Sequence, residues 1–296
     1  GHTARRGFLN GTTAGLEPLV LALVLSAAVM HATWNALVKS GGDKLVMQAL
    51  VIFAPTLIAG PALLVLPPMA PAAWPFLFTS IAVHLLYNGL LVSAYEQGDL
   101  SQVYPIARGS APALVAFGGW LAAGEVSGPG GLFGIALVSL GILVLAWRRS
   151  LPRDGEVRTI ALALATGGAI AAYSLTDGLG GRSSGAVLTY IAWLMFLQGP
   201  LMLAFTLWRR RGRTVAAFRP HLLRGLAGGL ISGLAYAIVI WAMARAPMAH
   251  VVALRETSVL LAAAIGTLLL REPFGRHRIA AAGIIVAGAA VLELAP

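Results

Sequence analysis

The sequence predicts an all-α polytopic membrane protein with ten transmembrane helices arranged as two inverted five-helix repeats. Three observations lead to this fold class. Hydrophobic residues occupy 58% of the 296 positions and charged residues only 11%, which is too few charges to cover a water-soluble fold of this size. The apolar residues form long continuous runs, and the two halves of the chain carry similar motifs in the same order.

The apolar runs have the length of membrane spans, because a transmembrane helix needs about 20 mostly apolar residues. The predicted spans are 18–38, 45–66, 74–96, 101–123, 130–147, 157–178, 185–208, 222–246, 248–270 and 277–294. They leave no room for a soluble domain. We therefore divide the chain into an N-terminal tail (1–17), a first five-helix repeat (18–150) and a second five-helix repeat (151–296).

The basic residues predict the orientation of the chain. Two of the 21 Lys and Arg residues, Arg108 and Arg255, fall inside spans, and the other 19 divide into 15 on one side of the membrane and four on the other. The positive-inside rule places the larger group in the cytoplasm and hence both termini on the non-cytoplasmic side. The excess of Arg over Lys (19 to 2) and the many Ala and Gly residues favour a bacterial plasma (inner) membrane.

The two halves align best around the fourth and ninth spans, where Ser93–Ala123 matches Trp241–Arg271 without a gap. Ser110 then corresponds to Ser258. Because each half has five spans, an odd number, the second half must enter the membrane in the opposite direction. Inverted repeats are typical of secondary transporters, whose substrate site lies near the bilayer midplane between the repeats.

The motifs in these regions resemble a known family. The stretch Tyr104–Gly109 is followed by Gly124–Glu125. In the second half, Leu270–Pro273 matches the region of Gly124–Glu125. This pattern resembles the EamA-type transporters of the drug/metabolite transporter superfamily, and within them the YddG-type exporters. The resemblance implies a basket of ten helices that exports aromatic and other neutral amino acids by alternating access.

Polar and aromatic side chains inside the spans predict a substrate pocket, because such groups are costly against lipid and usually face a cavity. His84, Tyr87 and Asn88 share one face of the third span, and rings with polar tips suit a ligand with an apolar ring and a polar head. Hydrogen bonding between helices is the alternative role. The predicted substrate-binding residues are Trp34, His84, Tyr87, Asn88, Tyr104, Arg108, Tyr173, Trp193 and Tyr236.

Arg108 and Glu256 occupy corresponding positions in the two repeats, and a pseudo-twofold axis would bring them together. A lone charge at the membrane centre costs about 2.5–3.5 kcal/mol on insertion scales, so we expect an ion pair. The pair is either structural or part of a gate, in which Arg108 receives a substrate carboxylate and Glu256 responds to protons. Asp177 lies near the end of its span, where exposure to solvent is expected.

These features predict a secondary transporter that exports small neutral amphipathic metabolites, with aromatic amino acids as the leading candidates. The chain has no His-Glu-x-x-His and no Walker loop, and its one G-x-S-x-G string, Gly181–Gly185, follows no strand, so an enzyme is not expected. We expect no cofactor, no metal and no nucleic-acid partner, and a monomer embedded in lipid. The alternatives are an exporter of hydrophobic cations, a sugar-phosphate carrier and a non-transporting membrane scaffold or receptor subunit. A phosphate carrier should have more than two cations within its spans.

Overall fold

The computed structural model describes residues 16–39, 43–97, 100–146, 156–210, 218–261, 264 and 276–294. All regular structure in these ranges is helical. Its elements are α2 (Pro18–Lys39), α3 (Lys44–Phe53), α4 (Thr56–Ala62), η1 (Pro71–Ala73), α5 (Trp74–Gln97), α6 (Leu100–Ala123), α7 (Pro129–Ala146), α8 (Glu156–Ser183), α9 (Val187–Arg209), η2 (Arg219–His221), α11 (Leu222–Met243), α12 (Met248–Arg255) and α14 (Arg276–Leu294).

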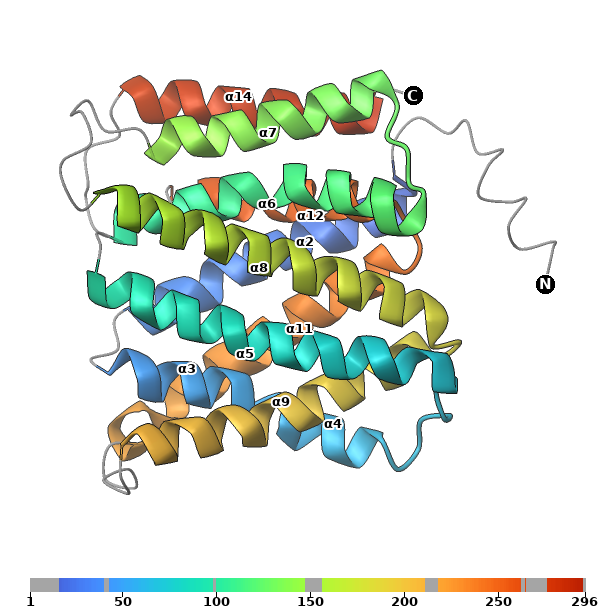
Figure 1. Ribbon diagram of the computed structural model, residues 1–296, viewed down its shortest axis with the longest axis vertical. Coiled ribbons are helices and arrows are strands. Elements are labelled where there is room, and N and C mark those ends of the chain that lie inside the picture. Colours follow the sequence, from blue (N-terminus) through green and yellow to red (C-terminus); the bar gives the residue numbers. More distant parts are fainter. Residues whose placement is uncertain are drawn as a thin grey trace.

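The helices lie side by side with roughly parallel axes, stacked along the vertical direction of Figure 1. The pair α7 and α14 forms one edge of the stack, and α3, α4 and α9 form the other. Helices of the first half pack against helices of the second: α7 on α14, α6 on α8, α5 on α8, α2 on α11, and α3 and α4 on α9. The core of the molecule therefore lies between the two halves of the chain.

The outer surface of the bundle is apolar. Seven of the described helical segments are long and apolar enough to cross a membrane, by length and composition. Large apolar side chains such as Leu64, Phe117 and Leu223 are exposed on the outside of the helices. A face of this kind suits lipid and not water. The chain is therefore an all-helical polytopic membrane protein, as the composition predicts.

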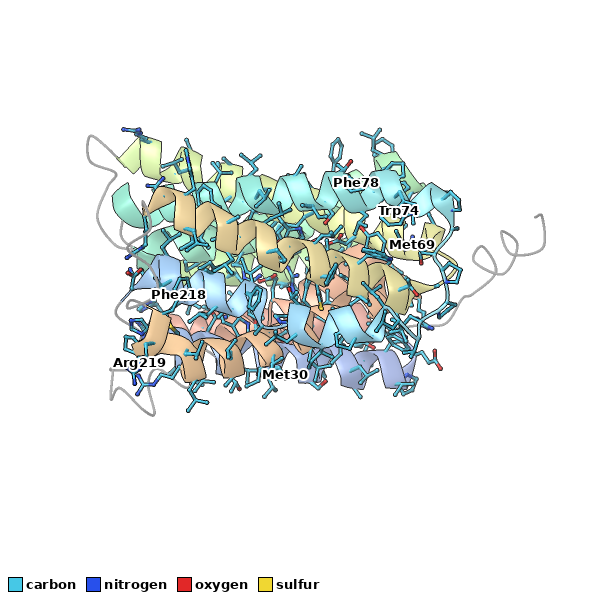
Figure 2. All side chains as sticks on the ribbon, turned by 90° about the horizontal axis from the view of Figure 1, so that it is seen from below. Met30, Met69, Trp74, Phe78, Phe218 and Arg219 are labelled. Atoms are coloured by element: carbon cyan, nitrogen blue, oxygen red, sulfur yellow. The ribbon has the colours of Figure 1, made fainter. Side chains whose placement is uncertain are left out.

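Both ends of the described chain lie at the same end of the bundle, because the Leu16 amide donates a hydrogen bond to a carboxylate oxygen of Glu293 (3.1 Å). Figure 2 shows Trp74 toward this end and Phe218 and Arg219 at the opposite end. We call these the Trp74 end and the Arg219 end.

The helix boundaries follow most of the predicted spans, and two departures matter for the site. Helix α8 continues to Ser183, five residues beyond the predicted end at 178. The ninth predicted span, 248–270, is not one uninterrupted helix: α12 ends at Arg255, a turn follows at Glu256 and Thr257, and helix resumes at 258–261. The rest of that span, apart from 264, lies outside the described residues.

The second predicted span is also divided, into α3 and α4, at Pro55. Proline has no amide hydrogen and interrupts the helical hydrogen bonds. At the start of α3 a carboxylate oxygen of Asp43 accepts from the Val46 amide (3.2 Å), which is the usual N-cap arrangement. The two pieces together still form one membrane-length segment, Lys44–Ala62.

Glycines allow helices of the two halves to approach closely. A Cβ atom added at Gly288 of α14 would lie 2.8 Å from the Val138 nitrogen of α7, and one at Gly229 of α11 would lie 2.5 Å from the Val51 oxygen of α3. Neither distance is compatible with a side chain. Gly229 of α11 therefore allows close helix packing, as small residues commonly do in membranes.

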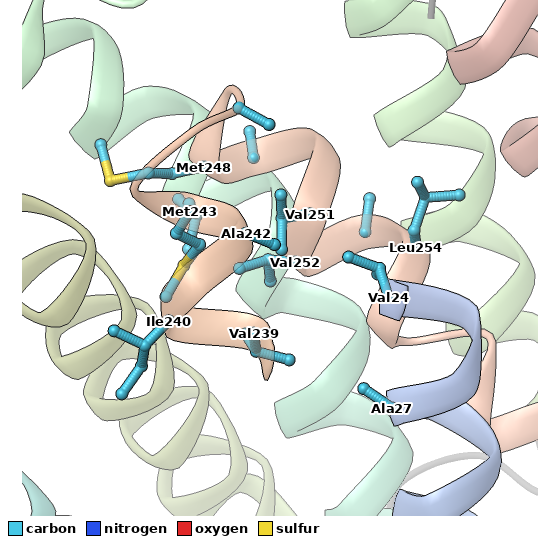
Figure 3. Packing of buried hydrophobic residues seen from close by; sticks show 14 of the residues in the cluster. Val24, Ala27, Val239, Ile240, Ala242, Met243, Met248, Val251, Val252 and Leu254 are labelled. Atoms are coloured by element: carbon cyan, nitrogen blue, oxygen red, sulfur yellow. The ribbon is translucent and has the colours of Figure 1, made fainter. Parts of the chain in front are cut away.

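Buried aliphatic side chains hold α12 in place. Figure 3 shows Val24 of α2, Val239 and Met243 of α11, and Val251 and Leu254 of α12 gathered in one cluster. All five are at most 2% exposed. Because α12 is enclosed on several sides, the charged residues that follow Leu254 have a fixed position inside the bundle.

Candidate functional site

Among the residues that the structure describes, four charged side chains are buried between the helices: Arg108, Asp177, Arg255 and Glu256, with exposures of 4%, 0%, 3% and 0%. A buried charge needs a partner or a ligand, because desolvation is costly in this environment. Three of the four belong to one group of contacts, which we call the ion cluster (His31, Arg108, Arg255, Glu256). Asp177 belongs to a second group, the carboxylate hub (Ser80, Asp177, Tyr190, Tyr236).

The ion cluster joins α2, α6 and α12 through Glu256. One carboxylate oxygen of Glu256 lies 3.1 Å from Nε of Arg108. The other accepts from Arg255, at 2.9 Å from Nη2 and 3.3 Å from Nε. The second arm of Arg108 contacts Nε2 of His31. The structure thus brings Arg108 and Glu256 together and adds Arg255 and His31 to them.

The ion cluster carries more positive than negative charge. A guanidinium group can only donate hydrogen bonds, so the His31 nitrogen that contacts Arg108 must be an acceptor and the imidazole must be neutral. Two guanidinium groups then face one carboxylate, which leaves one positive charge without a negative partner inside this cluster. A site with this balance is suited to an anionic group of a ligand.

Trp34 shares the same environment. Its indole nitrogen lies 3.2 Å from Nδ1 of His31, and the two rings meet edge to face at 5.3 Å. A neutral imidazole has only one acceptor nitrogen, so His31 accepts from Arg108 or from Trp34 and not from both. Trp34 and Arg108 therefore compete for His31 as a hydrogen-bond acceptor.

The backbone around Glu256 is wound more tightly than an α-helix. The amides of Thr257, Val259 and Leu260 bond to carbonyls three residues earlier, at 3.0–3.1 Å. Turns of this 3₁₀ type inside a helix often occur at functional hinges. Irregular backbone at membrane depth is also typical of transporter sites.

An aromatic cluster of His84, Tyr87, Tyr173 and Tyr236 lies between α5, α8 and α11. The His84 ring stacks on Tyr173 with 4.1 Å between centroids and an interplanar angle of 23°. Tyr236 meets Tyr173 edge to face at 5.9 Å, and Tyr87 does so at 5.5 Å. The structure therefore gathers four of the predicted pocket residues from three helices.

The aromatic cluster adjoins the ion cluster. Tyr173 packs with Ala107, which precedes Arg108 in the chain. Tyr173 also lies within electrostatic reach of Arg108, Arg255 and Glu256. A polar, positively charged region and a wall of rings are thus neighbours inside the bundle.

The carboxylate hub is centred on Asp177. Its two carboxylate oxygens accept from the hydroxyl of Tyr190 (2.9 Å) and from that of Tyr236 (2.5 Å). The expected exposure of Asp177 is wrong: the side chain is fully buried, because α8 continues for six residues beyond it. The sequence shows no helix-terminating residue directly after Asp177, so α8 continues to Ser183 and Asp177 lies in the interior of the bundle.

Three other predicted pocket residues stand apart from the aromatic cluster or outside the description. Asn88 accepts from Gln48 of α3 (3.1 Å) and donates to the His84 carbonyl (2.8 Å), so its amide joins helices. Trp193 contacts Trp74 at 5.4 Å and Phe196 at 5.9 Å. The side chain of Tyr104 lies outside the described residues, although its backbone belongs to α6.

A further ion pair lies at the Trp74 end of the bundle, between Arg182 and Glu125 (2.5 Å). Arg182 also donates to the carbonyls of Met243 (2.9 Å) and Ala246 (2.8 Å), where α11 ends. Glu125 accepts from the amide of Met248, the first residue of α12 (3.0 Å). This end pair therefore ties the ends of α6, α8, α11 and α12 together.

Sequence reasoning missed the partners of two buried charges. Arg255 directly precedes Glu256 and falls inside the same predicted span, a signal that both belong to one buried group. Tyr190 stood out in the sequence only as an aromatic residue three positions before Trp193, and Ser80 carried no signal, because their role depends on Asp177 being buried beside them.

Comparisons with known proteins give one family match and one solved structure of similar fold. Residues 158–294, which include Tyr173, Asp177, Tyr236 and the Arg255–Glu256 pair, match the model of the EamA-like transporter family. A solved structure titled "Crystal structure of protein" has the same fold, with a TM-score of 0.77 and 17% sequence identity over 94% of this chain and 98% of that one. Curated protein sequences give no significant match.

The fold is that of a polytopic membrane protein, and somewhat less than half of the chain, residues 158–294, is similar to the EamA-like transporter family. This similarity makes the buried groups described above candidates for parts of a transport pathway.

Proposed function

We propose that this chain is a secondary transporter that exports small neutral amphipathic metabolites, amino acids with aromatic side chains foremost, by alternating access. The observation that carries the proposal is the adjacency of the ion cluster and the aromatic cluster. It offers two kinds of recognition to one ligand, one for a carboxylate and one for a ring.

The ion cluster supports recognition of a carboxylate. Arg108 and Arg255 share the single carboxylate of Glu256, and a substrate carboxylate would supply the second negative charge. The planar guanidinium fork matches carboxylate geometry. Arg108 is the primary candidate because it also belongs to α6, whose residue Ala107 packs against Tyr173 of the aromatic cluster.

The aromatic cluster supports recognition of an apolar side chain. Rings prefer edge-to-face or offset neighbours with centroids 4.5–7 Å apart, and Tyr87, Tyr173 and Tyr236 already adopt such arrangements. A substrate ring entering between them would make contacts of the same type. This matches the expected YddG-like preference for aromatic amino acids.

The packing of the helices supports the two repeats, 18–150 and 151–296, and their inverted relation. Exchanging the halves replaces α2 by α8, α5 by α11 and α7 by α14. Under this exchange the packing of α5 on α8 becomes that of α11 on α2, and the packing of α7 on α14 is unchanged. Both pairs occur, as a pseudo-twofold axis in the membrane plane requires.

The proposed orientation places the Trp74 end outside and the Arg219 end in the bacterial cytoplasm, for a monomer in the inner membrane. Arg182 and Arg245 belong to the smaller group of basic residues, assigned to the outside. Arg182 is paired with Glu125, and Arg245 lies over the Trp241 ring at 4.1 Å. Both residues thus have structural partners, which explains why basic side chains occur on the side that carries few of them.

The test is exchange in proteoliposomes. Vesicles loaded with unlabelled phenylalanine should take up labelled phenylalanine at equal pH on both sides, and leucine should compete. Phenylalanine amide, which has the ring and no carboxylate, should compete poorly. If no amino acid exchanges, the proposal is wrong.

A second candidate, an exporter of hydrophobic cations, is favoured by one observation. Among the described contacts, Asp177 accepts hydrogen bonds from hydroxyl groups and forms no salt bridge with an Arg or Lys, and it lies beside aromatic rings. Carboxylates and rings are typical partners of organic cations. Uptake of labelled tetraphenylphosphonium without amino acid exchange would select this candidate.

A further inference from the structure

Asp177 takes no part in the recognition of carboxylate and ring proposed above. It has no exposed surface and nevertheless lies between four helices. The residues that face it are Ser80 and His84 of α5, Tyr190 of α9, Tyr236 of α11 and, one turn earlier on α8, Tyr173; Arg255 of α12 acts electrostatically on His84 and Tyr236.

The hydrogen bonds of Asp177 depend on its charge. An ionised carboxylate accepts only, and it accepts here from two phenol groups. A protonated carboxyl group has its own proton to donate and one acceptor position fewer. Taking up a proton must therefore weaken or reverse the bond to Tyr190 or to Tyr236, which loosens α8 from α9 or from α11.

The hub is connected to the pocket wall by two routes. Tyr236 donates to Asp177 with its hydroxyl and packs against Tyr173 with its ring. Ser80 lies beside Asp177, and its hydroxyl is 3.1 Å from Nδ1 of His84, whose ring stacks on Tyr173. A change in the protonation of Asp177 therefore reaches two of the three rings that contact Tyr173, those of His84 and Tyr236.

The buried groups of the ion cluster are less suited to exchanging a proton. Arginine does not lose its proton in proteins. Protonating Glu256 would remove the negative charge that Arg108 and Arg255 share, which is costly in a buried position. His31 is held as a neutral acceptor beside Arg108. Among the described buried acids, Asp177 has the partners that tolerate a change of charge, because hydroxyl groups can both donate and accept.

We propose that Asp177 is the proton-coupling group of this carrier, binding one proton in exchange for each substrate and transmitting the change to the pocket through Tyr236 and the Ser80–His84 pair. The inference rests on the proposed transport function and adds its energy source. It also explains why a carboxylate is kept between four helices at a position that lipid and water do not reach.

The experiment uses the full chain in proteoliposomes with the membrane potential clamped to zero. Labelled phenylalanine starts at equal concentration inside and outside, and the lumen is made one pH unit more acidic. Proton antiport should concentrate the label inside up to about tenfold, because one pH unit corresponds to a tenfold ratio of protons. Depletion of the label, or no change while exchange at equal pH is rapid, would overturn the inference.

Asp177→Asn should abolish this accumulation and keep exchange at equal pH within about threefold of the wild type, since the amide still accepts a hydrogen bond. Asp43→Asn is the matched control. Asp43 is a partly buried carboxylate paired with Arg210, away from the hub, and its loss should leave accumulation intact. Accumulation that survives in Asp177→Asn, or is lost equally in Asp43→Asn, contradicts the assignment.

An infrared measurement keeps the inference testable if phenylalanine is not a substrate. The carbonyl stretch of a buried protonated carboxyl group should appear as pH is lowered in the purified wild type and be absent in Asp177→Asn. Failure of exchange at equal pH would then reject the proposed substrate, and absence of an Asp177-dependent band would reject the proton site.

Discussion

The ion cluster and the end pair use the same residue types and have different chemistry. In the ion cluster Arg108 and Glu256 are 4% and 0% exposed, and Arg255 adds a second positive charge. In the end pair Arg182 and Glu125 are 22% and 13% exposed, with one charge of each sign. The other bonds of Arg182 and Glu125 described above go to backbone carbonyls and to an amide at helix ends.

This comparison separates a structural ion pair from a candidate binding site. Arg182 and Glu125 carry one charge of each sign, and both also bond to backbone groups at helix ends, which is the pattern of a structural pair. In the ion cluster two buried guanidinium groups share one carboxylate, and a ligand carboxylate would add a second negative charge. Residue type and pairing distance do not distinguish the two; charge balance and backbone partners do.

The largest effect is expected for Glu256→Gln. It removes the negative charge that the buried Arg108 and Arg255 share, and breaking a buried pair in this way costs about 3–5 kcal/mol. The unfolding midpoint of the purified protein in detergent should fall strongly. Glu125→Gln is the matched control at the end pair, where partial exposure to water should make the loss smaller. Equal losses would remove the distinction between the two regions.

Glu256→Gln also tests the gate that the sequence suggests. If any folded protein remains, its exchange of phenylalanine should be impaired and should depend differently on pH. Transport with unchanged rate and unchanged pH dependence would show that Glu256 has no gating role and that the pair with Arg108 is structural.

Arg255→Gln should have an intermediate effect, on binding more than on stability. It leaves one guanidinium group and one carboxylate, a balanced pair like the end pair, so the protein should fold. Affinity for phenylalanine should fall about 10- to 100-fold, equivalent to about 1.4–2.7 kcal/mol, because one of the two guanidinium groups is gone. Competition assays with phenylalanine and with its amide measure this.

The amide provides the internal control for Arg255→Gln. Its weak competition should change little, since it has no carboxylate to lose contact with the arginines. A similar loss for both compounds would mean that the substitution disturbs the pocket as a whole and that the arginines do not recognise a carboxylate.

The smallest effect is expected for Arg182→Gln at the end pair. Partly exposed ion pairs contribute about 0.2–1 kcal/mol, and the two carbonyl bonds contribute about as much again. The chain has no cysteine, so Ala246→Cys introduces a single thiol where α11 ends. Thiol labelling at this site should be faster when Arg182→Gln is added, because the Trp74 end opens more often.

Labelling of the same thiol in Asp43→Asn provides the comparison, because Asp43 pairs with Arg210 where α3 begins and α9 ends, away from the end pair. Its rate should match that of Ala246→Cys alone. If Arg182→Gln does not speed the labelling, the end pair does not hold that end of the bundle closed.

Much of the helical fold was predictable from local patterns. Apolar runs bounded by polar residues gave spans such as 18–38 and 74–96, which coincide closely with α2 and α5. The grouping of His84 with Tyr87 on one face of α5 follows from helical spacing alone. Helical spacing could not establish their contact with Tyr173 and Tyr236, because those residues lie about 90 or more positions away along the chain.

Other parts of the site could not be predicted in this way. Asp177 is buried because α8 extends past it and because α5, α9 and α11 surround it. Trp193 has a span position as central as that of several pocket residues, yet it contacts Trp74. The turn at Glu256 interrupts a run whose hydropathy is continuous. In each case the outcome depends on neighbours that are distant in sequence.

The sequence by itself determined the membrane environment, the positions of most helices and the types of side chain available for recognition, because hydropathy and helical periodicity are properties of contiguous residues. Only the tertiary structure decided which charges are balanced, which carboxylate is hidden and which rings face one another. Those properties arise where helices from the two halves meet, and the free energy of a buried charge depends on the partners that meet it there.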